Sequence, residues 1–181
     1  LGLIAHESRE MADLIEDLLI AARSEEGLVP VFPERTDLSL LATSVANRLS
    51  VPEDVTLDIA DVESPAYADP VRVRQIIRNL LTNAIRYGGR AITVTAGGGD
   101  GVSFIEVHDD GAGIPEADRQ RIFEPYGRSE ASGVVAGSVG LGLALSKRLA
   151  ELLSGTLEYR PGPGCTFRLT VPDHAPESVE A

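Results

Sequence analysis

The stretch over residues 70–89, PVRVRQIIRNLLTNAIRYGG, carries the clearest structural pattern in the chain. Its apolar residues recur at steps of three and four, which is the repeat of a helix that buries one face. The core-facing set is Ile76, Ile77, Leu80, Leu81, Ala84 and Ile85. Asp69-Pro70 is typical of a helix start, and Gly88-Gly89 is typical of a helix stop. The stretch therefore predicts one strong amphipathic helix.

A polar stripe runs along the same helix. Gln75, Asn79 and Asn83 are spaced four apart, so they share one face, and Arg86 continues the stripe. Asparagine is a mediocre helix former, so two of them inside a helix need a reason. One interpretation is a solvated face. The other is a pair of amide oxygens aimed at a hard cation, with Arg86 and Tyr87 beside a nucleotide, and this segment alone leaves both open.

The segments around this helix alternate between strands and helices. The expected strands are residues 56–60, 64–68, 92–97, 102–109, 156–160 and 165–171, and the further expected helices are 38–50, 116–123 and 140–155. The links GGGDG and PGPG are expected to form hairpins, and 64–68 is a candidate partner for 56–60. This order predicts an α/β fold, a two-layer sandwich of a mixed β-sheet and about three helices, rather than a doubly wound Rossmann sheet.

Another long helix is predicted ahead of this sandwich, over residues 3–25. Its apolar stripe consists of Ile4, Met11, Leu14, Leu18 and Ala21. A lone amphipathic helix cannot bury such a stripe, so it needs a partner helix from this protein or from another copy. We divide the chain into this helix (1–27), a hinge or short strand (28–36), a main domain (37–172) and a disordered tail (173–181).

The composition limits what the protein binds and where it works. A net charge of −12 repels nucleic-acid phosphates from most of the surface. Cys165 is the single cysteine, so neither a disulfide framework nor a zinc cluster is expected. No apolar run approaches the roughly 20 residues that a membrane span needs. The chain starts at Leu1 without a leader, so we expect a cytoplasmic fragment of a longer protein, with any membrane anchor upstream.

Two glycine-rich segments carry candidate binding residues. In HDDGAGI, Asp109 ends a strand, and Gly111 and Gly113 permit a tight turn and the close approach of a ligand. Taken alone, a plain glycine-rich turn is the favoured interpretation of this segment. The segment GSVGLGLALSKRLAE leads straight into a helix N-terminus, where free backbone N–H groups favour phosphate oxygens. It lacks the GxxxxGK[ST] pattern, which excludes a P-loop.

The residues between these two segments have two interpretations. Phe123 and Tyr126 flank Pro125 and serve as core plugs, as anchors of a lid over a ligand, or as both. In the lid interpretation Arg128 reaches a phosphate. Lys147 lies later in the following helix and is expected to be solvated.

The order of these motifs resembles the catalytic ATP-binding domain of bacterial sensor histidine kinases. The segments are ADPVRVRQIIRNLLTNAIRYG, DDGAGI, RIFEPYGR, GSVGLGLALSKRLAELLSG and GCTFRLTVP. This is the Bergerat fold, shared with gyrase, heat-shock chaperone ATPases and mismatch-repair proteins. The resemblance covers residues 36–172, and the helix over 3–25 looks like the second helix of the kinases' dimerisation and phosphotransfer domain.

For the phosphate end of the nucleotide, the resemblance implies an N box and a glycine box. Asn79 and Asn83 match the asparagines that hold Mg²⁺ and the phosphates, and Arg86 matches the basic residue that reaches them. The residues under the triphosphate are Gly140, Leu141 and Gly142, and Arg128 is a further phosphate candidate. The usual box reads G-x-G-L-G-L, and Ser138 replaces its first glycine here, so the conformation of residues 137–139 is not implied.

For the adenine end, the resemblance implies a separate set of residues. Asp109 matches the aspartate that accepts a hydrogen bond from the adenine amino group. Gly111 and Gly113 shape the adenine pocket, and Tyr87 matches the aromatic residue beside the nucleoside. ATP and Mg²⁺ are the expected substrate and cofactor.

Position 79 separates kinases from ATPases and serine kinases of the same fold. Those relatives usually carry a Glu four residues before the second Asn, and it serves as a general base. Asn79 cannot accept a proton near neutral pH, which favours transfer to an imidazole that is already nucleophilic. A degenerate domain that binds only a partner is the third hypothesis, and the intact motifs disfavour it. The implied partners are a response-regulator receiver domain and a second copy, which dimerises through the helical hairpin.

His6 imitates the phosphoacceptor of this family without matching it. The family motif runs His-Glu-x-Arg-(Thr or Asn)-Pro, and here Glu10-Met11 follows the first four residues. One helix and a proline-rich hinge separate His6 from Asp37, which leaves no room for a return helix. We therefore expect the true acceptor upstream of this chain and no autophosphorylation of His6.

Overall fold

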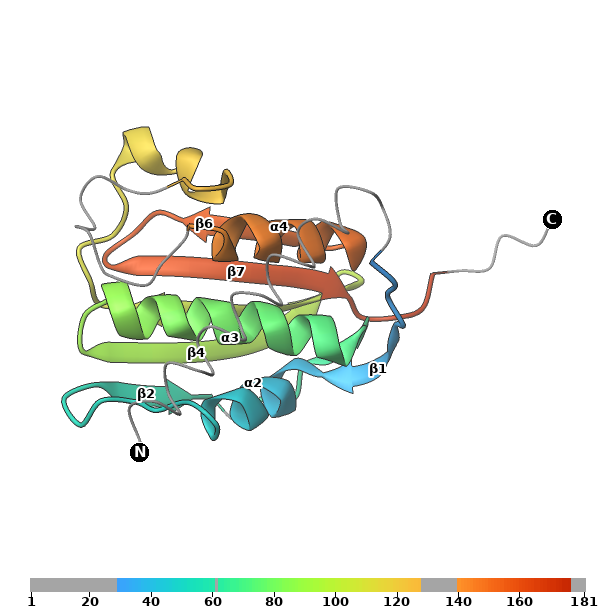
Figure 1. The fold of residues 1–181 in the computed structure, drawn as a ribbon. Helices are drawn as coiled ribbons and strands as arrows, with labels where there is room; N and C mark the ends of the chain where they lie inside the picture. The colour runs from blue at the N-terminus through green and yellow to red at the C-terminus, as the bar shows by residue number, and fades with distance from the viewer. Residues whose placement is uncertain (1–28, 61, 128–139, 177–181) are drawn as a thin grey trace, which may run out of the picture.

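The structure is a computed structural model, and it describes residues 29–60, 62–127 and 140–176 of the 181-residue chain (Figure 1). In chain order the elements are β1 (Glu34–Asp37), α2 (Leu38–Ala46), β2 (Thr56–Ile59), β3 (Pro65–Ala68), α3 (Pro70–Tyr87), β4 (Ala91–Gly99), β5 (Val102–Asp109), the 3₁₀ helices η1 (Glu116–Asp118) and η2 (Arg121–Phe123), α4 (Gly142–Leu152), β6 (Thr156–Arg160) and β7 (Cys165–Pro172). The predicted helix over residues 3–25, with His6, lies outside the described residues.

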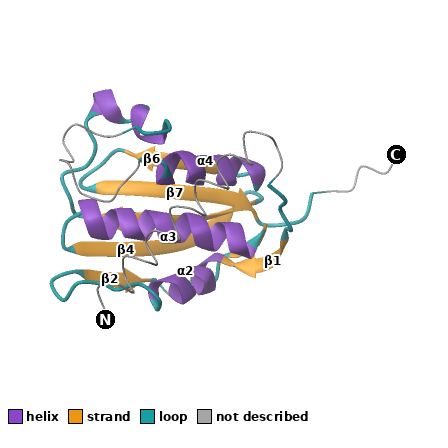
Figure 2. Cartoon of the chain, in the orientation of Figure 1, coloured by secondary structure: helices purple, strands orange, loops and turns teal. Residues whose placement is uncertain are grey.

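Two layers make up the fold, as Figures 1 and 2 show. Five strands form one sheet in the order β2-β4-β5-β7-β6, and helices α2, α3 and α4 cover one of its faces. The β2–β4 pair is parallel and the other neighbouring pairs are antiparallel, so the sheet is mixed. The predicted two-layer α/β sandwich is confirmed. No helix in the described ranges has the length and apolar character needed to cross a membrane.

Helix α3 lies at the centre of the helical layer, and its sequence marks both of its ends. The Asp69 carboxylate accepts hydrogen bonds from Val71 N at 2.8 Å and Arg72 N at 3.3 Å, which caps the N-terminus. Gly88 ends the helix by donating its N–H to Ala84 O at 2.9 Å. The buried face consists of Val73, Ile76, Ile77, Leu80, Leu81 and Ala84, whereas Ile85 is only partly buried. Each fully buried Ile or Leu contributes about 1.5–3 kcal/mol relative to exposure, so this face fixes the helix on the sheet.

The partner of residues 64–68 differs from the sequence prediction. Strand β3 pairs antiparallel with β1, and β2 pairs parallel with β4, so 56–60 and 64–68 do not pair with each other. Ser64, just before β3, contacts both sheets. Its hydroxyl donates to Gly97 O of β4 at 2.9 Å, and its N–H donates to the Asp37 carboxylate at the end of β1 at 2.9 Å. The bond to Asp37 lies beside the Asp37–Pro65 pair and so supports the antiparallel pairing of β3 with β1. The segment expected to be a hinge or short strand therefore supplies strand β1.

Several element ends also differ from the prediction. Helix α2 is capped by Asp37, as predicted, but it ends at Ala46 instead of Ser50. Beyond Ala46, the N–H groups of Arg48 and Leu49 donate to the carbonyls three residues earlier, those of Val45 and Ala46. This is the 3₁₀ pattern, which often tightens the last turn of a helix. The expected helix over 116–123 is two separate 3₁₀ helices. Asp173, the first residue of the expected disordered tail, is held by a backbone hydrogen bond to the β4–β5 turn.

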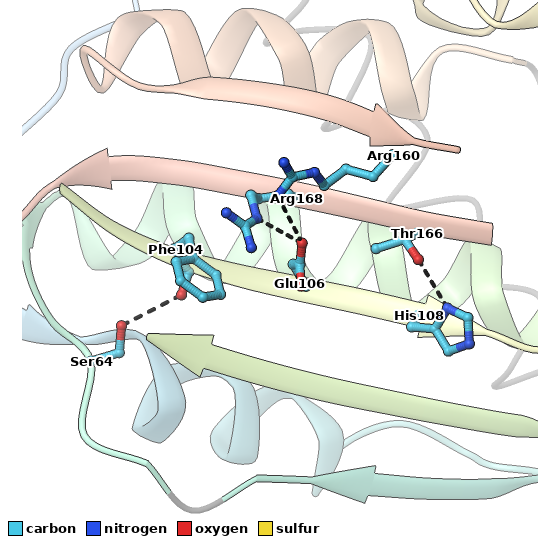
Figure 3. A network of polar contacts seen from close by, with 7 residues as sticks. All are labelled: Ser64, Phe104, Glu106, His108, Arg160, Thr166 and Arg168. Atoms are coloured by element: carbon cyan, nitrogen blue, oxygen red, sulfur yellow. Dashed lines mark hydrogen bonds and ion pairs between the residues drawn. The ribbon is translucent and has the colours of Figure 1, made fainter. Parts of the chain in front are cut away.

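The face of the sheet that the helices leave open is polar. On β5 the buried residues are Ser103, Ile105, Val107 and Asp109, and the alternate residues lie on the opposite face. Figure 3 shows that opposite face, where the Glu106 carboxylate is 2.6 Å from Arg168 Nε and 3.5 Å from Arg160 Nη1. Burial works to raise the pKa of Glu106, but the hydrogen bonds and charges of the two arginines hold it below its usual value. Asp109 lies on the other face, among the apolar residues that meet the helices.

Candidate functional site

The predicted polar stripe of α3 faces helix α4. Asn79 Nδ2 donates to Ser146 Oγ on α4 at 2.9 Å, and Ser146 is buried. The Asn79 side chain also lies against Gly142, the first residue of α4, where a Cβ would be 2.2 Å from Asn79 Oδ1. Only glycine fits at position 142 while Asn79 keeps this place. Asn79 is therefore not part of a solvated face, because its nitrogen bonds Ser146 and its oxygen lies beside the start of α4.

Helix α3 as a whole is positively charged. Asn83 and Arg86 are partly buried further along the helix, and Tyr87 at its end is exposed. Helix α3 carries four arginines and no acidic residue, in a chain with a net charge of −12. A positive helix on an acidic protein favours an anionic ligand at that place.

Asp109 ends strand β5 on the side that faces the helices, with only 5% of its surface exposed. Its Oδ1 accepts the N–H of Gly111 at 3.0 Å. Cys165 is the strand partner of Asp109 on β7, and the Asp109 carboxylate adds to burial in raising the pKa of its thiol. Burial raises the pKa of Asp109, and the hydrogen bond from Gly111 opposes this only in part. A buried acceptor of this kind favours a ligand that donates a hydrogen bond to it.

Glycines let the chain close tightly around Asp109. A Cβ on Gly88, at the end of α3, would lie 2.7 Å from Asp109 Cβ and Cγ, and one on Gly111 would lie 2.7 Å from Asp109 Oδ1. Gly113 has a φ of +72°, in the left-handed region that side chains disfavour, and a Cβ there would lie 2.7 Å from Gly164 O. The C-terminus of α3 therefore meets the end of β5, while the middle of the same helix meets α4.

The N-terminus of α4 has the chemistry of an anion site. Within the described part of the chain no side chain caps this 11-residue helix, whose N-cap is Leu141. Its first backbone N–H groups therefore lack intrahelical partners. Gly140 precedes it with a φ of +73°, and Tyr126 N–H donates to Gly140 O at 3.0 Å. Gly142 then places the start of α4 directly beside Asn79.

The residues between the glycine segments divide into core and surface. Phe123 is partly buried and packs against Phe167 with ring centroids 6.1 Å apart, whereas Tyr126 is 66% exposed. The core-plug interpretation therefore holds for Phe123 and not for Tyr126. Lys147 is exposed, as expected, with its Nζ 5.2 Å from the Phe123 ring centroid. Arg128 lies outside the described residues, so its phosphate contact stays a prediction.

Sequence reasoning missed three residues that support the site, namely Ser146, Cys165 and Tyr159. Ser146 accepts a hydrogen bond from Asn79, Cys165 is the strand partner of Asp109, and Tyr159 accepts a hydrogen bond from Ile114 in the loop that follows β5. These contacts join distant parts of the chain; Asn79 and Ser146, for example, are 67 residues apart. No local spacing in the sequence predicts such contacts. The one available signal was the position of Ser146, one helical turn after Gly142.

The residues present fit a magnesium nucleotide. Mg²⁺ prefers oxygen ligands and usually takes only one or two from the protein, with phosphates and water supplying the others. Asn79 and Asn83 would supply two amide oxygens from adjacent turns of α3. Among the described residues, no group of three or more His, Cys, Asp and Glu side chains could hold a metal alone. A cation at this site would therefore depend on the phosphates of its nucleotide.

Comparison with known proteins identifies the family. A family model described as histidine kinase-, DNA gyrase B-, and HSP90-like ATPase matches residues 68–175. The virulence sensor protein BvgS of Bordetella bronchiseptica is 37% identical over 184 residues, which cover 93% of this chain and 15% of BvgS. The signal transduction histidine-protein kinase AfsQ2 of Streptomyces coelicolor is 30% identical over 181 residues, 98% of this chain and 34% of AfsQ2. This chain therefore spans only a small part of the curated relatives that it matches.

The fold also matches a solved structure. The ATP binding domain of PrrB from Mycobacterium tuberculosis superposes with a TM-score of 0.63 at 25% identity, covering 79% of this chain and 98% of that domain. The resemblance to sensor histidine kinases inferred from the motifs is confirmed by these matches. The chain belongs to the family of histidine kinase-, DNA gyrase B-, and HSP90-like ATPases, with sensor proteins and histidine kinases as its relatives.

Proposed function

We propose that this chain is the ATP-binding catalytic core of a sensor histidine kinase, which transfers the γ-phosphoryl group of ATP to a histidine. The observation that carries the proposal is the placement of helix α3, which meets Asp109 at its C-terminus and the start of α4 at Asn79. From Asn79 to Gly88 the helix rises by about 13 Å. This separation suits the base and the triphosphate of one nucleotide, bound at opposite ends.

At the base end, Asp109 provides the selectivity. The exocyclic amino group of adenine donates a hydrogen bond to the buried carboxylate, which Gly111 N–H holds in place. Guanine carries a carbonyl at that position, so two acceptors would face each other in a buried site, at a cost of about 1–3 kcal/mol. We therefore expect ADP to bind about 5- to 150-fold more tightly than GDP. Gly113 shapes the same pocket, and Tyr87 lies beside the nucleoside.

At the phosphate end, the proposed ligands are two side-chain amides, one arginine and backbone N–H groups. Asn79 and Asn83 contribute oxygens to Mg²⁺, which offsets the charge of the phosphate oxygens when it is bound. Arg86 contributes a positive side chain to the same phosphates. The glycine-box residues Gly140, Leu141 and Gly142 contact the triphosphate through their backbone, at the start of α4.

Position 79 favours phosphoryl transfer to histidine over hydrolysis. Hydrolysis needs a general base that takes a proton from water. The amide of Asn79 cannot accept that proton, and helix α3 contains no acidic residue. A neutral imidazole needs no such base because it is already nucleophilic. The reaction then rests on positioning and on electrostatic stabilisation of the transferred group.

The rest of the proposal concerns the whole protein, of which this chain spans a small part. We propose that the whole protein works in a two-component system and forms a homodimer through a helical hairpin to which residues 1–27 belong. The phosphoryl group then passes from its histidine to an aspartate of a response-regulator receiver domain. The names of the relatives support this role. The ATP-binding domain over 37–172 works in the cytoplasm, where ATP is available. Val29 is buried in its core, so ordered packing begins before residue 37.

Titration calorimetry tests the proposal on the chain as it is. ADP with Mg²⁺, ADP with EDTA and GDP with Mg²⁺ are compared, and we expect one nucleotide per chain with the strongest binding in the first condition. The absence of heat at roughly millimolar ADP would overturn the nucleotide site. Equal affinity for ADP and GDP would remove the role of Asp109. Sustained phosphate release from ATP would favour an ATPase over a histidine kinase.

A further inference from the structure

We propose that Tyr159 and Arg119 clamp the backbone of Ile114 and thereby position the loop that follows Asp109 for the base of the nucleotide. The inference rests on the proposed nucleotide site and adds positioning residues to it. Neither Tyr159 nor Arg119 belongs to a motif that the sequence reveals.

Both backbone polar groups of Ile114 are held by side chains from elsewhere in the chain. The Tyr159 hydroxyl on β6 accepts Ile114 N–H at 3.2 Å, and Arg119 Nε donates to Ile114 O at 3.2 Å. The Arg119 guanidinium also lies over the Tyr159 ring, with its Cζ 5.6 Å from the ring centroid. This distance lies within the range of a cation–π contact. The two side chains therefore act as one unit that closes around a single residue.

The loop between Asp109 and Ile114 needs such a constraint. Its four residues form neither helix nor strand, and two of them are glycines, which permit many backbone conformations. The near end is fixed, because Asp110 N–H donates to Ala91 O at 3.1 Å. The far end is fixed by the clamp at Ile114. Since Gly111 N–H holds the Asp109 carboxylate, a loop that is free at its far end would orient that carboxylate less well.

Aromatic packing keeps the Tyr159 hydroxyl in place. The Tyr159 ring meets the Phe167 ring edge-on at 5.7 Å, and Phe167 meets Phe123 at 6.1 Å. A Cβ on Gly113 would lie 3.4 Å from the Tyr159 hydroxyl, so the loop passes close to that hydroxyl. Because the ring is held by its neighbours, the hydroxyl cannot follow Ile114 when the loop moves. The hydrogen bond is thus a positional constraint on the loop.

The variant Tyr159→Phe removes the hydroxyl and keeps the ring. We expect the Kd for ADP to rise about 3- to 10-fold, the usual effect of one lost hydrogen bond on an equilibrium. Because the loop serves the base and not the phosphates, the same factor is expected for ADP with Mg²⁺, ADP with EDTA, and AMP. Arg119→Lys keeps the charge but loses the Nε donor, so it should act in the same direction. Tyr67→Phe on β3 is the matched control and should leave every Kd unchanged.

Amide hydrogen exchange at Ile114 in the unliganded protein gives a second measurement, and Tyr159→Phe is expected to make it faster. Unchanged Kd values, or a loss confined to the Mg²⁺ condition, would overturn the positioning role. Unchanged exchange at Ile114 would overturn the clamp itself. If the parent protein binds no ADP, the proposed nucleotide site falls and the positioning role falls with it, while the exchange rate still decides whether the clamp exists.

Discussion

Replacing Gly142 with alanine tests the phosphate end of the site through a single added carbon. The new Cβ would lie 2.2 Å from Asn79 Oδ1, 2.9 Å from its Cγ and 3.1 Å from its Nδ2. The Asn79 amide must therefore move by about 1 Å before it reaches ordinary contact distance. Its hydrogen bond to Ser146, which is 2.9 Å long, cannot survive that displacement. Gly142→Ala thus displaces Asn79 without changing it.

The fold is expected to tolerate this change while nucleotide binding does not. Losing the Asn79–Ser146 hydrogen bond costs about 1 kcal/mol, and alanine stabilises a helix by about 0.5–1 kcal/mol relative to glycine. Gly142 does not have a positive φ, so alanine adopts its backbone conformation without strain. We expect the free energy of unfolding to change by less than about 1 kcal/mol. A lost interaction with a charged ligand costs about 1.5–3 kcal/mol, so the Kd for Mg·ADP should rise about 10- to 150-fold.

Urea unfolding and calorimetric titration with Mg·ADP measure the two quantities separately. Gly162→Ala is the matched control, because no atom beyond its two chain neighbours lies within 4 Å of the position of its Cβ. In an Asn79→Ala background, Gly142→Ala should add little further loss, since both substitutions act through the same amide. The reasoning is refuted if Gly142→Ala binds Mg·ADP within about twofold of the parent, or if its loss is undiminished in the Asn79→Ala background.

Three further substitutions or treatments test the remaining groups. Asp109→Asn should weaken ADP about 10- to 150-fold. Burial raises the pKa of Asp109, so the charged carboxylate destabilises the folded protein at pH values above that raised pKa. Melting scans of Asp109→Asn should therefore show a Tm equal to or higher than that of the parent near neutral pH. The difference in Tm should shrink as the pH falls toward 3.8, the ordinary pKa of an aspartate. Asn83→Ala should lose the Mg²⁺-dependent part of ADP affinity and keep the affinity measured in EDTA, and an equal loss in both conditions would contradict its role. Burial, followed by the charge and hydrogen bond of Asp109, raises the pKa of Cys165 from 9.0 to about 12. Only the thiolate reacts with iodoacetamide, so mass spectrometry should detect slow alkylation of Cys165 at about pH 8 and faster alkylation toward pH 12. Asp109→Asn should be alkylated faster than the parent, because it removes the neighbouring negative charge.

Local patterns predicted the parts of the fold and site that local chemistry determines. The caps and buried face of α3 followed from one stretch of sequence, because each depends on neighbours within a few residues. Asp109 was placed at the end of its strand for the same reason. The contact of Asn79 with Ser146 and the pairing of β3 with β1 were not predicted, because they join residues far apart in the chain. Tyr159 alternates with its neighbours on β6 like any strand residue, so its pattern says nothing about the loop that its hydroxyl meets.

The net negative charge of the chain and the positive charge of helix α3 act on different ligands. The charge of α3 acts on a small anion bound beside it, whereas the net charge acts on a ligand that covers much of the surface. At physiological salt, charges are screened beyond about 8 Å, so a small anion at the site responds mainly to the groups around it. In the proposed site those groups are Arg86 and the N–H groups at the start of α4 that lack intrahelical partners, and both would attract phosphate. A long polyanion would also cover the surface that carries the net charge of −12, and there it would be repelled. The net charge therefore argues against nucleic acid as a ligand, while the local field of α3 and α4 favours a single nucleotide.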